Sequence, residues 1–138
     1  MNVDVKISVI IPAYNCQNTI SKSIDSIIAQ SFKAHEIIVV DDGSSDNTFN
    51  YVRQMFPEVK LYKQENKGPA SARNLGISVA SGNWISFLDS DDTLNHDALK
   101  SYGILVDKNS TLNWIAGAYF KVLDNRKKLI VYKEKSIK

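Results

Sequence analysis

The sequence predicts a single α/β domain with a mostly parallel β-sheet, flanking helices and a C-terminal β-hairpin. Two observations support this prediction. Short runs of β-branched residues do not alternate with polar ones, which is typical of buried parallel strands, and helical periodicity appears between those runs. The length of 138 residues and the hydrophobic content of 43% suit one domain with its own core. We therefore expect four strand–helix units followed by two further strands.

The first unit is a strand–helix–strand segment near the N-terminus. Residues 7–11 and 37–40 are the two apolar runs, and isoleucines recur at helical spacing between them. Asn18 or Thr19 is available to cap this helix. Two parallel strands joined by such a helix have a right-handed crossover.

The next two units contain the helix boundaries that are easiest to predict. Asp46 suits the cap of a helix that ends at Pro57, because proline cannot continue a helix. Residues 59–62 then form a short strand. Pro69 fits the first position of the third helix, and Gly82 fits its C-terminal cap.

The last part of the chain begins with a strand that ends in acidic residues. Residues 84–88 form this fourth strand, and Asn95 suits the cap of the helix that follows. Residues 114–120 and 129–132 are β-like runs that we expect to turn at residues 124–125. The predicted order is therefore βαβαβαβαββ.

Polar and acidic side chains follow three of the predicted strands at their C-terminal ends. In open α/β sheets, ligands bind outside the carboxyl ends of the strands. If each acidic cluster is considered alone, its residues could equally serve to form a turn and to cap a helix. Two acidic strand ends in one sheet favour a binding site instead. The acids that we expect at this edge are Asp41, Asp42, Asp89, Asp91 and Asp92.

Carboxylates at this edge are suited to binding a divalent cation. The chain has neither a G-x-G-x-x-G motif nor a lysine-bearing P-loop. Two unit charges about 4 Å apart interact by roughly 4 kcal/mol at an effective dielectric near 20, so the acids would repel a diphosphate. Mg²⁺ or Mn²⁺ binds one or two carboxylates and completes its shell with phosphates and water. Tyr14 is placed either to stack on a base or to pack in the ordinary way.

Three stretches together resemble glycosyltransferase family 2, whose members have the GT-A fold. They are VIIPAYNCQNTISKSIDSIIAQS, EIIVVDDGSSDNT and NKGPASARNLGISVASGNWISFLDSDD, and the resemblance covers roughly residues 6–107. It implies an inverting transferase that takes a nucleotide-diphosphate sugar, usually a UDP-sugar, with Mn²⁺ or Mg²⁺. The implied acceptor is a hydroxyl of a saccharide or a lipid-linked molecule, in polysaccharide or glycoconjugate synthesis.

The resemblance assigns the metal-binding role to the acidic turn. Asp89, Ser90 and Asp91 match the D-x-D motif of the family. Asp91 is then the principal metal ligand, and Asp89 contacts the metal, the ribose or the metal-bound diphosphate. Asp92 supports this pair.

The resemblance also places the nucleotide. Asp41 and Asp42 match the position that holds the base, and Arg73 matches a basic residue near the nucleotide. From the residues alone, Arg73 could equally pair with Asp42 or Asp91. The loop that lines the base is implied to consist of Pro12, Ala13 and Tyr14.

The general base of the family is expected downstream, beyond Lys138, so the catalytic base is unassigned. Residues 1–138 are interpreted as one nucleotide-sugar-binding domain without its acceptor-binding part. The alternative is a non-catalytic domain that binds a nucleotide or a partner. A receiver-like domain fits poorly, because the third strand ends in lysine. The later acids, none of which stands in a matching motif, are Asp97, Asp107, Asp124 and Glu134.

Charge and composition limit the partners and the compartment. A net charge of +2 does not indicate a nucleic-acid partner. Residues 121–138 form a basic hairpin and tail with seven Lys or Arg residues, which indicates either solvated surface or peripheral contact with an anionic membrane. The lone Cys16 and the absence of a signal-peptide pattern predict the cytoplasm, with the inner face of the membrane as the place of contact.

Overall fold

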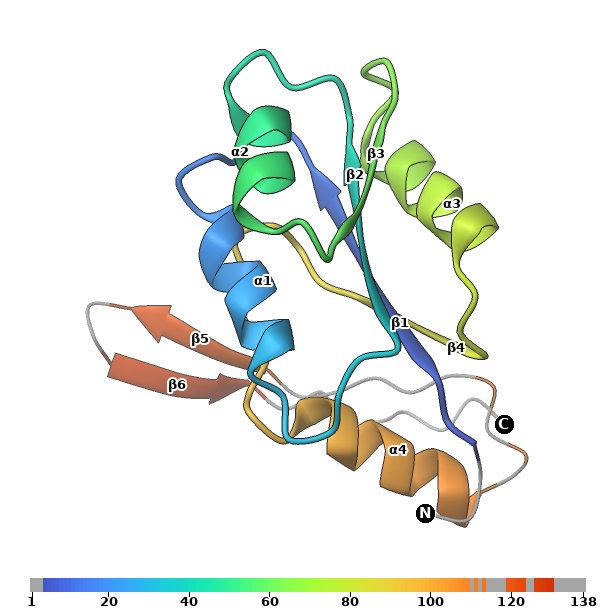
Figure 1. Cartoon of the computed structure of the whole chain (residues 1–138). Coiled ribbons are helices and arrows are strands. Elements are labelled where there is room, and N and C mark those ends of the chain that lie inside the picture. The colour runs from blue at the N-terminus through green and yellow to red at the C-terminus, as the bar shows by residue number, and fades with distance from the viewer. Residues whose placement is uncertain (1–3, 110, 112, 114–118, 124–125, 131–138) are drawn as a thin grey trace.

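The computed structural model describes residues 4–109, 111, 113, 119–123 and 126–130. Its centre is a parallel four-stranded sheet with the strand order β3–β2–β1–β4 (Figure 1). This confirms the predicted α/β fold class. The strands are β1 (Ile7–Ala13), β2 (Glu36–Asp41), β3 (Lys60–Lys63) and β4 (Trp84–Phe87), and the helices are α1 (Ile20–Ile28), α2 (Thr48–Met55), α3 (Pro69–Val79) and α4 (Ala98–Lys108).

Helices cover both faces of this sheet, which explains why β1 and β2 are apolar throughout. On one face, Ile10 and Ile38 pack with Ala72 of α3. On the other face, Val9 packs in the cluster that contains Ile24 of α1 and residues of α2 and α4. Figure 1 shows α3 on the side of the sheet opposite α1 and α2. Strands buried on both faces have no solvent-facing positions for polar residues.

The strand order creates a switch point between β1 and β4. From β1 the chain passes through α1 to β2 and then to β3 at one edge, and it returns through α3 to β4 beside β1. At such a point the connections leave the two neighbouring strands in opposite directions, so a crevice opens at their carboxyl ends. The predicted ligand-binding edge lies there.

The predicted capping residues differ from those in the structure at three helices. Asp46 is not the N-cap of α2, which is Asn47, but its carboxylate accepts hydrogen bonds from the amide and hydroxyl of Thr48 (2.9 and 2.6 Å). Asp97, and not Asn95, precedes α4 as its N-cap. The backbone carbonyl of Asn95 instead accepts hydrogen bonds from Ala98 and from a side chain of another segment.

The role of Gly82 is packing against β1, not capping of α3, whose C-cap is Ala80. A Cβ atom on Gly82 would lie 2.5 Å from Ser8 Oγ and 2.6 Å from the carbonyl oxygen of Lys6. The Gly82 amide donates a hydrogen bond to Ser8 Oγ (2.9 Å). Glycine is therefore required because two backbone segments approach closely.

Beyond α4, the described residues include β5 (Tyr119–Leu123) and β6 (Arg126–Ile130), which pair antiparallel in a separate sheet. The predicted strands at residues 114–120 and 129–132 are shifted relative to these bounds, and residues 114–118 and 131–132 lie outside the described residues. The predicted turn at residues 124–125 and the end of the basic tail also lie outside them. In the described part of the chain, no helix has the length and hydropathy needed to span a membrane.

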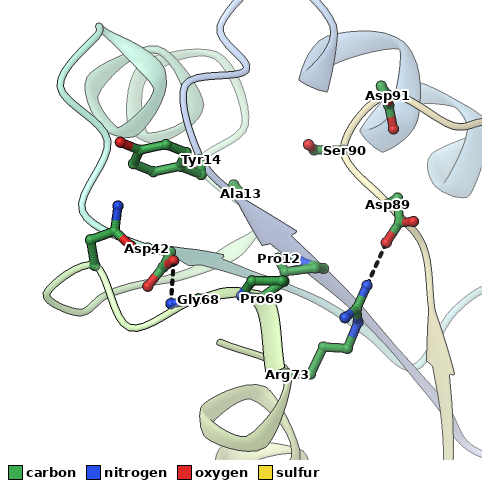
Figure 2. A pocket seen from close by; sticks show the side chains of 11 residues that line it. Pro12, Ala13, Tyr14, Asp42, Gly68, Pro69, Arg73, Asp89, Ser90 and Asp91 are labelled. Atoms are coloured by element: carbon green, nitrogen blue, oxygen red, sulfur yellow. Dashed lines mark hydrogen bonds and ion pairs between the residues drawn. The ribbon is translucent and has the colours of Figure 1, made fainter. Parts of the chain in front are cut away.

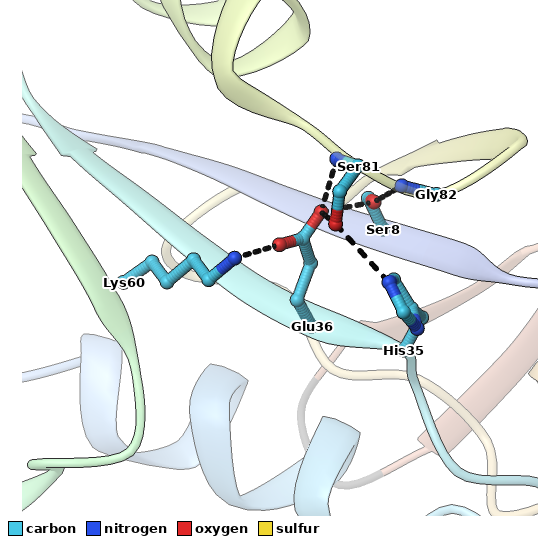
Figure 3. Close-up of polar contacts among 6 residues, drawn as sticks. All are labelled: Ser8, His35, Glu36, Lys60, Ser81 and Gly82. Carbon is cyan, nitrogen blue, oxygen red and sulfur yellow. Dashed lines mark hydrogen bonds and ion pairs between the residues drawn. The ribbon is translucent and has the colours of Figure 1, made fainter.

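Glu36, the first residue of β2, is the centre of a polar cluster near the N-terminal ends of the strands (Figure 3). Its side chain is only 5% exposed and pairs with Lys60. The carboxylate also accepts hydrogen bonds from Ser8 Oγ (2.6 Å) and from the amide of Ser81 (2.6 Å). Burial alone would raise the pKa of Glu36, but these donors outweigh it and hold the pKa at about 2.

The Glu36 cluster is expected to make folding sensitive to acid. Because the pKa is lower in the folded chain, the stabilisation is complete above about pH 4.5 and is lost as the pH falls toward about 2. Glu36→Gln is expected to lower the free energy of unfolding by about 1–3 kcal/mol at pH 7. It should also flatten the loss of stability between pH 4.5 and pH 2. Urea unfolding at several pH values measures both effects.

A suitable control is Asp4→Asn, which breaks an ion pair with Lys6 in which the Asp4 side chain is 79% exposed. Exposed pairs contribute little, so this variant should keep the wild-type dependence of stability on pH. If Glu36→Gln shows the same acid dependence as Asp4→Asn, the assignment of acid sensitivity to Glu36 is wrong.

Candidate functional site

A pocket of about 440 Å³ lies where the carboxyl ends of β1, β2 and β4 meet (Figure 2). It occupies the position that the switch point predicts. Tyr14 and Asp42 lie toward one end of it, and Asp89 and Asp91 lie toward the other. Its lining consists of Pro12, Ala13, Tyr14, Asp42, Asn66, Gly68, Pro69, Arg73, Asp89, Ser90 and Asp91.

Tyr14 lines the pocket and is followed by a turn that hydrogen bonds fix in place. Tyr14 is 50% exposed, so one part of its ring is open to a ligand. Asn15 has a φ of 46°, in the left-handed region that asparagine tolerates. Its side-chain oxygen accepts hydrogen bonds from the amides of Ser45 (2.8 Å) and Asp46 (3.3 Å). These bonds fix the loop after β1 to the loop after β2.

Asp42 is a buried carboxylate with strong partners. It is 4% exposed, and its Oδ1 accepts hydrogen bonds from Gln64 Nε2 (2.7 Å) and the amide of Lys67 (2.8 Å). Its Oδ2 accepts one from the amide of Gly68 (2.9 Å). Burial would raise the pKa of Asp42, but these three donors lower it below its usual range. Asp42 is therefore ionised at neutral pH, and Oδ2 can accept a further hydrogen bond from a ligand.

Asp41 does not line the pocket, although the sequence paired it with Asp42. It is fully buried, its Oδ2 accepts a hydrogen bond from the amide of Ser44 (3.2 Å), and its Oδ1 has no hydrogen-bond partner among the described residues. Successive side chains along a strand point to opposite faces, so the two carboxylates diverge. This alternation of side chains could have indicated from the sequence that only one of the two carboxylates faces the pocket.

Arg73 pairs with Asp89 and with neither of the two acids that the sequence suggested. Its Nη2 lies 2.7 Å from Asp89 Oδ1 (Figure 2). The guanidinium also lies 6.0 Å from the centre of the Phe87 ring. Arg73 projects from the first turns of α3, so its partner is set by the packing of that helix beside β4, which the linear sequence does not reveal.

The lining of the pocket is negatively charged overall. Three carboxylates, Asp42, Asp89 and Asp91, face one guanidinium, Arg73. Asp92 does not line the pocket, but the same negative charges affect its pKa. Burial raises the pKa of Asp92, and the nearby charges of Asp91 and Asp89 raise it further. An anionic ligand would therefore bind weakly unless a cation accompanied it.

The acidic turn fits a divalent cation whose remaining ligands come from a substrate. Within the described ranges, no three His, Cys, Asp or Glu side chains gather into a complete metal site. Mg²⁺ and Mn²⁺ do not require one, because they bind one or two carboxylates together with phosphates and water. Asp91 and Asp89 are the carboxylates at one end of the pocket that could serve as such ligands.

Part of the lining was not predicted as a site. Asn66 and Gly68 were not predicted as site residues and Pro69 only as a helix start, yet all three line the pocket. The backbone amides of Lys67 and Gly68 donate hydrogen bonds to Asp42. Gly43, with a φ of 74°, allows the close approach, since a Cβ there would lie 2.8 Å from the Asn66 amide nitrogen. The Gly–Pro pair at the start of α3, following a strand, was the available signal.

The strand order and the switch-point pocket define a GT-A-type α/β domain. The crystal structure of S. aureus TarS is similar to it, with a TM-score of 0.68 and 34% identity over 75% of this chain and 20% of that chain. The mannosyltransferase PcManGT from Pyrobaculum calidifontis, in complex with GDP-Man and Mn²⁺, has a TM-score of 0.59 and 29% identity over 67% of this chain and 29% of that one. Residues 8–129 match the model of glycosyl transferase family 2, and the chain belongs to that family.

Curated relatives agree with this family. Glycosyltransferase GlyA of Streptococcus pneumoniae is 42% identical over 104 residues, which cover 73% of this chain and 15% of that protein. The UDP-Glc:alpha-D-GlcNAc-diphosphoundecaprenol beta-1,3-glucosyltransferase WfgD of Escherichia coli is 39% identical over 124 residues, covering 88% of this chain and 48% of that protein. The chain spans 15 to 18% of the length of the first three curated relatives.

Proposed function

We propose that this chain is the donor-binding portion of an inverting glycosyltransferase. It binds a UDP-sugar with Mn²⁺ or Mg²⁺, and the sugar is transferred to a hydroxyl of a saccharide or lipid-linked acceptor in polysaccharide or glycoconjugate synthesis. The observation that carries this proposal is one pocket with an open aromatic ring and an ionised carboxylate at one end and an acidic turn at the other.

The Tyr14 end suits a uracil base. The Tyr14 ring offers a stacking surface, and Asp42 Oδ2 has capacity for the single imide N–H of uracil. The related TarS 1–349 was crystallised in complex with UDP and in complex with UDP-GlcNAc, at 31% and 33% identity to this chain. TarS supports UDP as the nucleotide, whereas the complex of PcManGT, at 29% identity, contains GDP-Man. We assign the buried Asp41 to positioning, because it holds the amide of Ser44 in the turn after Asp42.

The acidic end suits the diphosphate. Asp91, with Asp89, would hold the cation, which when bound supplies a Lewis acid that stabilises the negative charge of the leaving diphosphate. Arg73 adds a positive charge next to Asp89. Pro12 and Ala13 line the floor between the two ends. An acceptor hydroxyl attacks from the opposite face of the sugar, helped by a general base. That base, and peripheral membrane contact by residues 121–138 at the cytoplasmic face, stay predictions.

Isothermal titration with UDP in Mn²⁺, in Mg²⁺ and in EDTA tests the donor site. UDP is expected to bind about tenfold or more tightly with metal than in EDTA, a difference of about 1.4 kcal/mol. CDP is the matched control, because cytosine lacks the imide N–H from which Asp42 would accept a hydrogen bond. Equal affinity for UDP in Mn²⁺ and EDTA would contradict the proposal.

A turnover assay separates the transferase from a domain that only binds nucleotide. UDP-sugars are incubated with the chain and Mn²⁺, and release of UDP is measured with and without saccharide acceptors. Release of UDP excludes the binding-only alternative for this chain. Metal-dependent binding without release favours a donor-binding role that requires another part of the enzyme.

A further inference from the structure

Gln30 is a buried polar side chain outside the pocket. It is the second residue after α1 and is 1% exposed. Its Nε2 donates hydrogen bonds to the backbone carbonyls of Ser26 (3.0 Å) and Asn95 (2.6 Å), and its Oε1 accepts one from the buried amide of Leu99 (3.0 Å). Both amide hydrogens and the amide oxygen are therefore engaged.

Gln30 joins α1 to the segment between the acidic turn and α4 and to the first turn of α4: its partners are Ser26 in α1, Asn95 in that segment and Leu99 in α4. Residues 93–96 have no helix or strand, so their backbone groups need partners from elsewhere. Ser26 near the end of α1 and residues 30–31 supply them. Besides the Gln30 bonds, the amide of Leu94 donates to Ser26 Oγ (3.0 Å), and the amide of Ser31 donates to the carbonyl of His96 (3.0 Å).

The acidic turn is consequently held at both of its ends. Before the turn, the amide of Leu88 donates to the carbonyl of Ile10 (3.0 Å), which continues the β1–β4 pairing. After the turn, the Gln30 contacts attach residues 94–99 to α1. Between these points, the described hydrogen bonds include only one within the turn, from the amide of Asp92 to the carbonyl of Asp89 (3.1 Å). The ion pair between Arg73 and Asp89 and a hydrogen bond between Ser90 and Cys16 also hold the turn. The position of Asp91 thus depends in part on the downstream attachment.

Gln30 is the part of the downstream attachment that is shielded from water. Its bond to Leu99 is buried, whereas the hydrogen bond from Ser31 Oγ to Asp97 is exposed. A buried hydrogen bond is difficult to replace, because loss of one partner leaves the other without water. An apolar side chain at position 30 would leave the buried amide of Leu99 without its acceptor. The carbonyl of Asn95 would keep only the hydrogen bond from the amide of Ala98.

We propose that Gln30 is a positioning residue for the acidic turn. By fixing the segment after Asp92, it holds Asp91 and Asp89 where the cation and the diphosphate of the donor bind. Ligands need placement within about 0.5 Å, so a loosened turn would weaken metal-dependent binding without any change in the pocket lining. This inference rests on the proposed function for its ligand, but the effect on the turn itself can be measured without a ligand.

The variant Gln30→Met removes the three hydrogen bonds and keeps an unbranched side chain of similar length. The matched control is Val52→Ala, which opens a cavity in the core at a fully buried residue of α2, remote in sequence from the acidic turn. Hydrogen exchange of the whole chain is followed by NMR at a temperature at which both variants remain folded. The amide of Asp92 is expected to exchange about tenfold or more faster in Gln30→Met than in Val52→Ala.

Equal exchange at Asp92 in the two variants would overturn the proposal, because the turn would then not depend on Gln30. If Gln30→Met does not fold, Gln30→Glu serves instead, since its side chain keeps an acceptor for the amide of Leu99 and, when ionised, loses the donor to the carbonyl of Asn95. It should accelerate exchange at Asp92 in the same direction, and unchanged exchange there would likewise overturn the proposal.

UDP titration completes the test. Gln30→Met should lose the increase in UDP affinity caused by Mn²⁺, whereas its affinity in EDTA and both affinities of Val52→Ala should match the wild type. If the wild-type chain itself shows no metal dependence, the proposed function fails, and the exchange at Asp92 still decides the role of Gln30. If wild type and Gln30→Met share the same metal dependence, the inference fails and the proposed function stands.

Discussion

Asp91→Ala is expected to abolish the metal-dependent part of UDP binding, and the affinity in EDTA should not fall, because the substitution removes a charge that repels the diphosphate. Asp91 lines the acidic end of the pocket, and its carboxylate makes no hydrogen bond or ion pair to the described residues. The substitution therefore removes a metal ligand without removing a structural contact. The affinity for UDP with Mn²⁺ should fall by about tenfold or more, to the value in EDTA. Isothermal titration of both proteins with UDP measures this.

The control for Asp91→Ala is Asp25→Ala, which removes the same charge from an exposed position on α1 that is not part of the pocket lining. It should keep the wild-type response to Mn²⁺. The unfolding temperature of Asp91→Ala should stay close to that of the wild type. If Asp91→Ala retains the full metal response, the cation is not bound by the acidic turn.

Asp42→Asn is expected to weaken UDP binding equally in Mn²⁺ and in EDTA. The amide group places hydrogens where Asp42 now accepts from Gln64 and from the amides of Lys67 and Gly68, so one of these donors must lose its acceptor. The free energy of unfolding should therefore fall by about 1–3 kcal/mol. The loss of a free acceptor at Oδ2 should remove the preference for UDP over CDP.

Asp42→Asn and Asp91→Ala thus have different signatures, since only the second depends on metal. Urea unfolding and titration with UDP and CDP measure the two effects of Asp42→Asn, at a temperature at which the variant is folded. If Asp42→Asn still prefers UDP over CDP as strongly as the wild type does, the carboxylate of Asp42 does not recognise the base.

The order and type of the main elements could be predicted because their causes are local. The apolar runs at residues 7–11 and 37–40 are buried on both faces of the sheet, and that burial removes polar alternation from the sequence. Pro69 begins α3 as expected, because its fixed φ and missing N–H suit that position. Helix ends were less predictable. Glycine is typical of a helix C-cap, but the position of Gly82 is set by its contact with Ser8 in β1, which is 74 residues away in sequence.

The residues at the pocket were predictable where the strand ends alone determine them. Carboxyl ends of parallel strands meet at one edge, so the gathering of Asp42, Asp89 and Asp91 follows from the fold class. The partner of Arg73 does not follow, because it depends on how α3 packs beside β4. Gln30 carried no signal at all: its two distant partners lie 65 and 69 residues further along the chain.

A crystal structure of the chain grown with UDP and Mn²⁺, with anomalous scattering recorded for manganese, tests the central claim most directly. We predict a manganese peak within coordination distance of the Asp91 carboxylate and the UDP diphosphate. The uracil ring should lie against Tyr14, with its imide N–H directed at Asp42. A nucleotide bound outside this pocket, or manganese bound with Asp91 uncoordinated, would contradict the account.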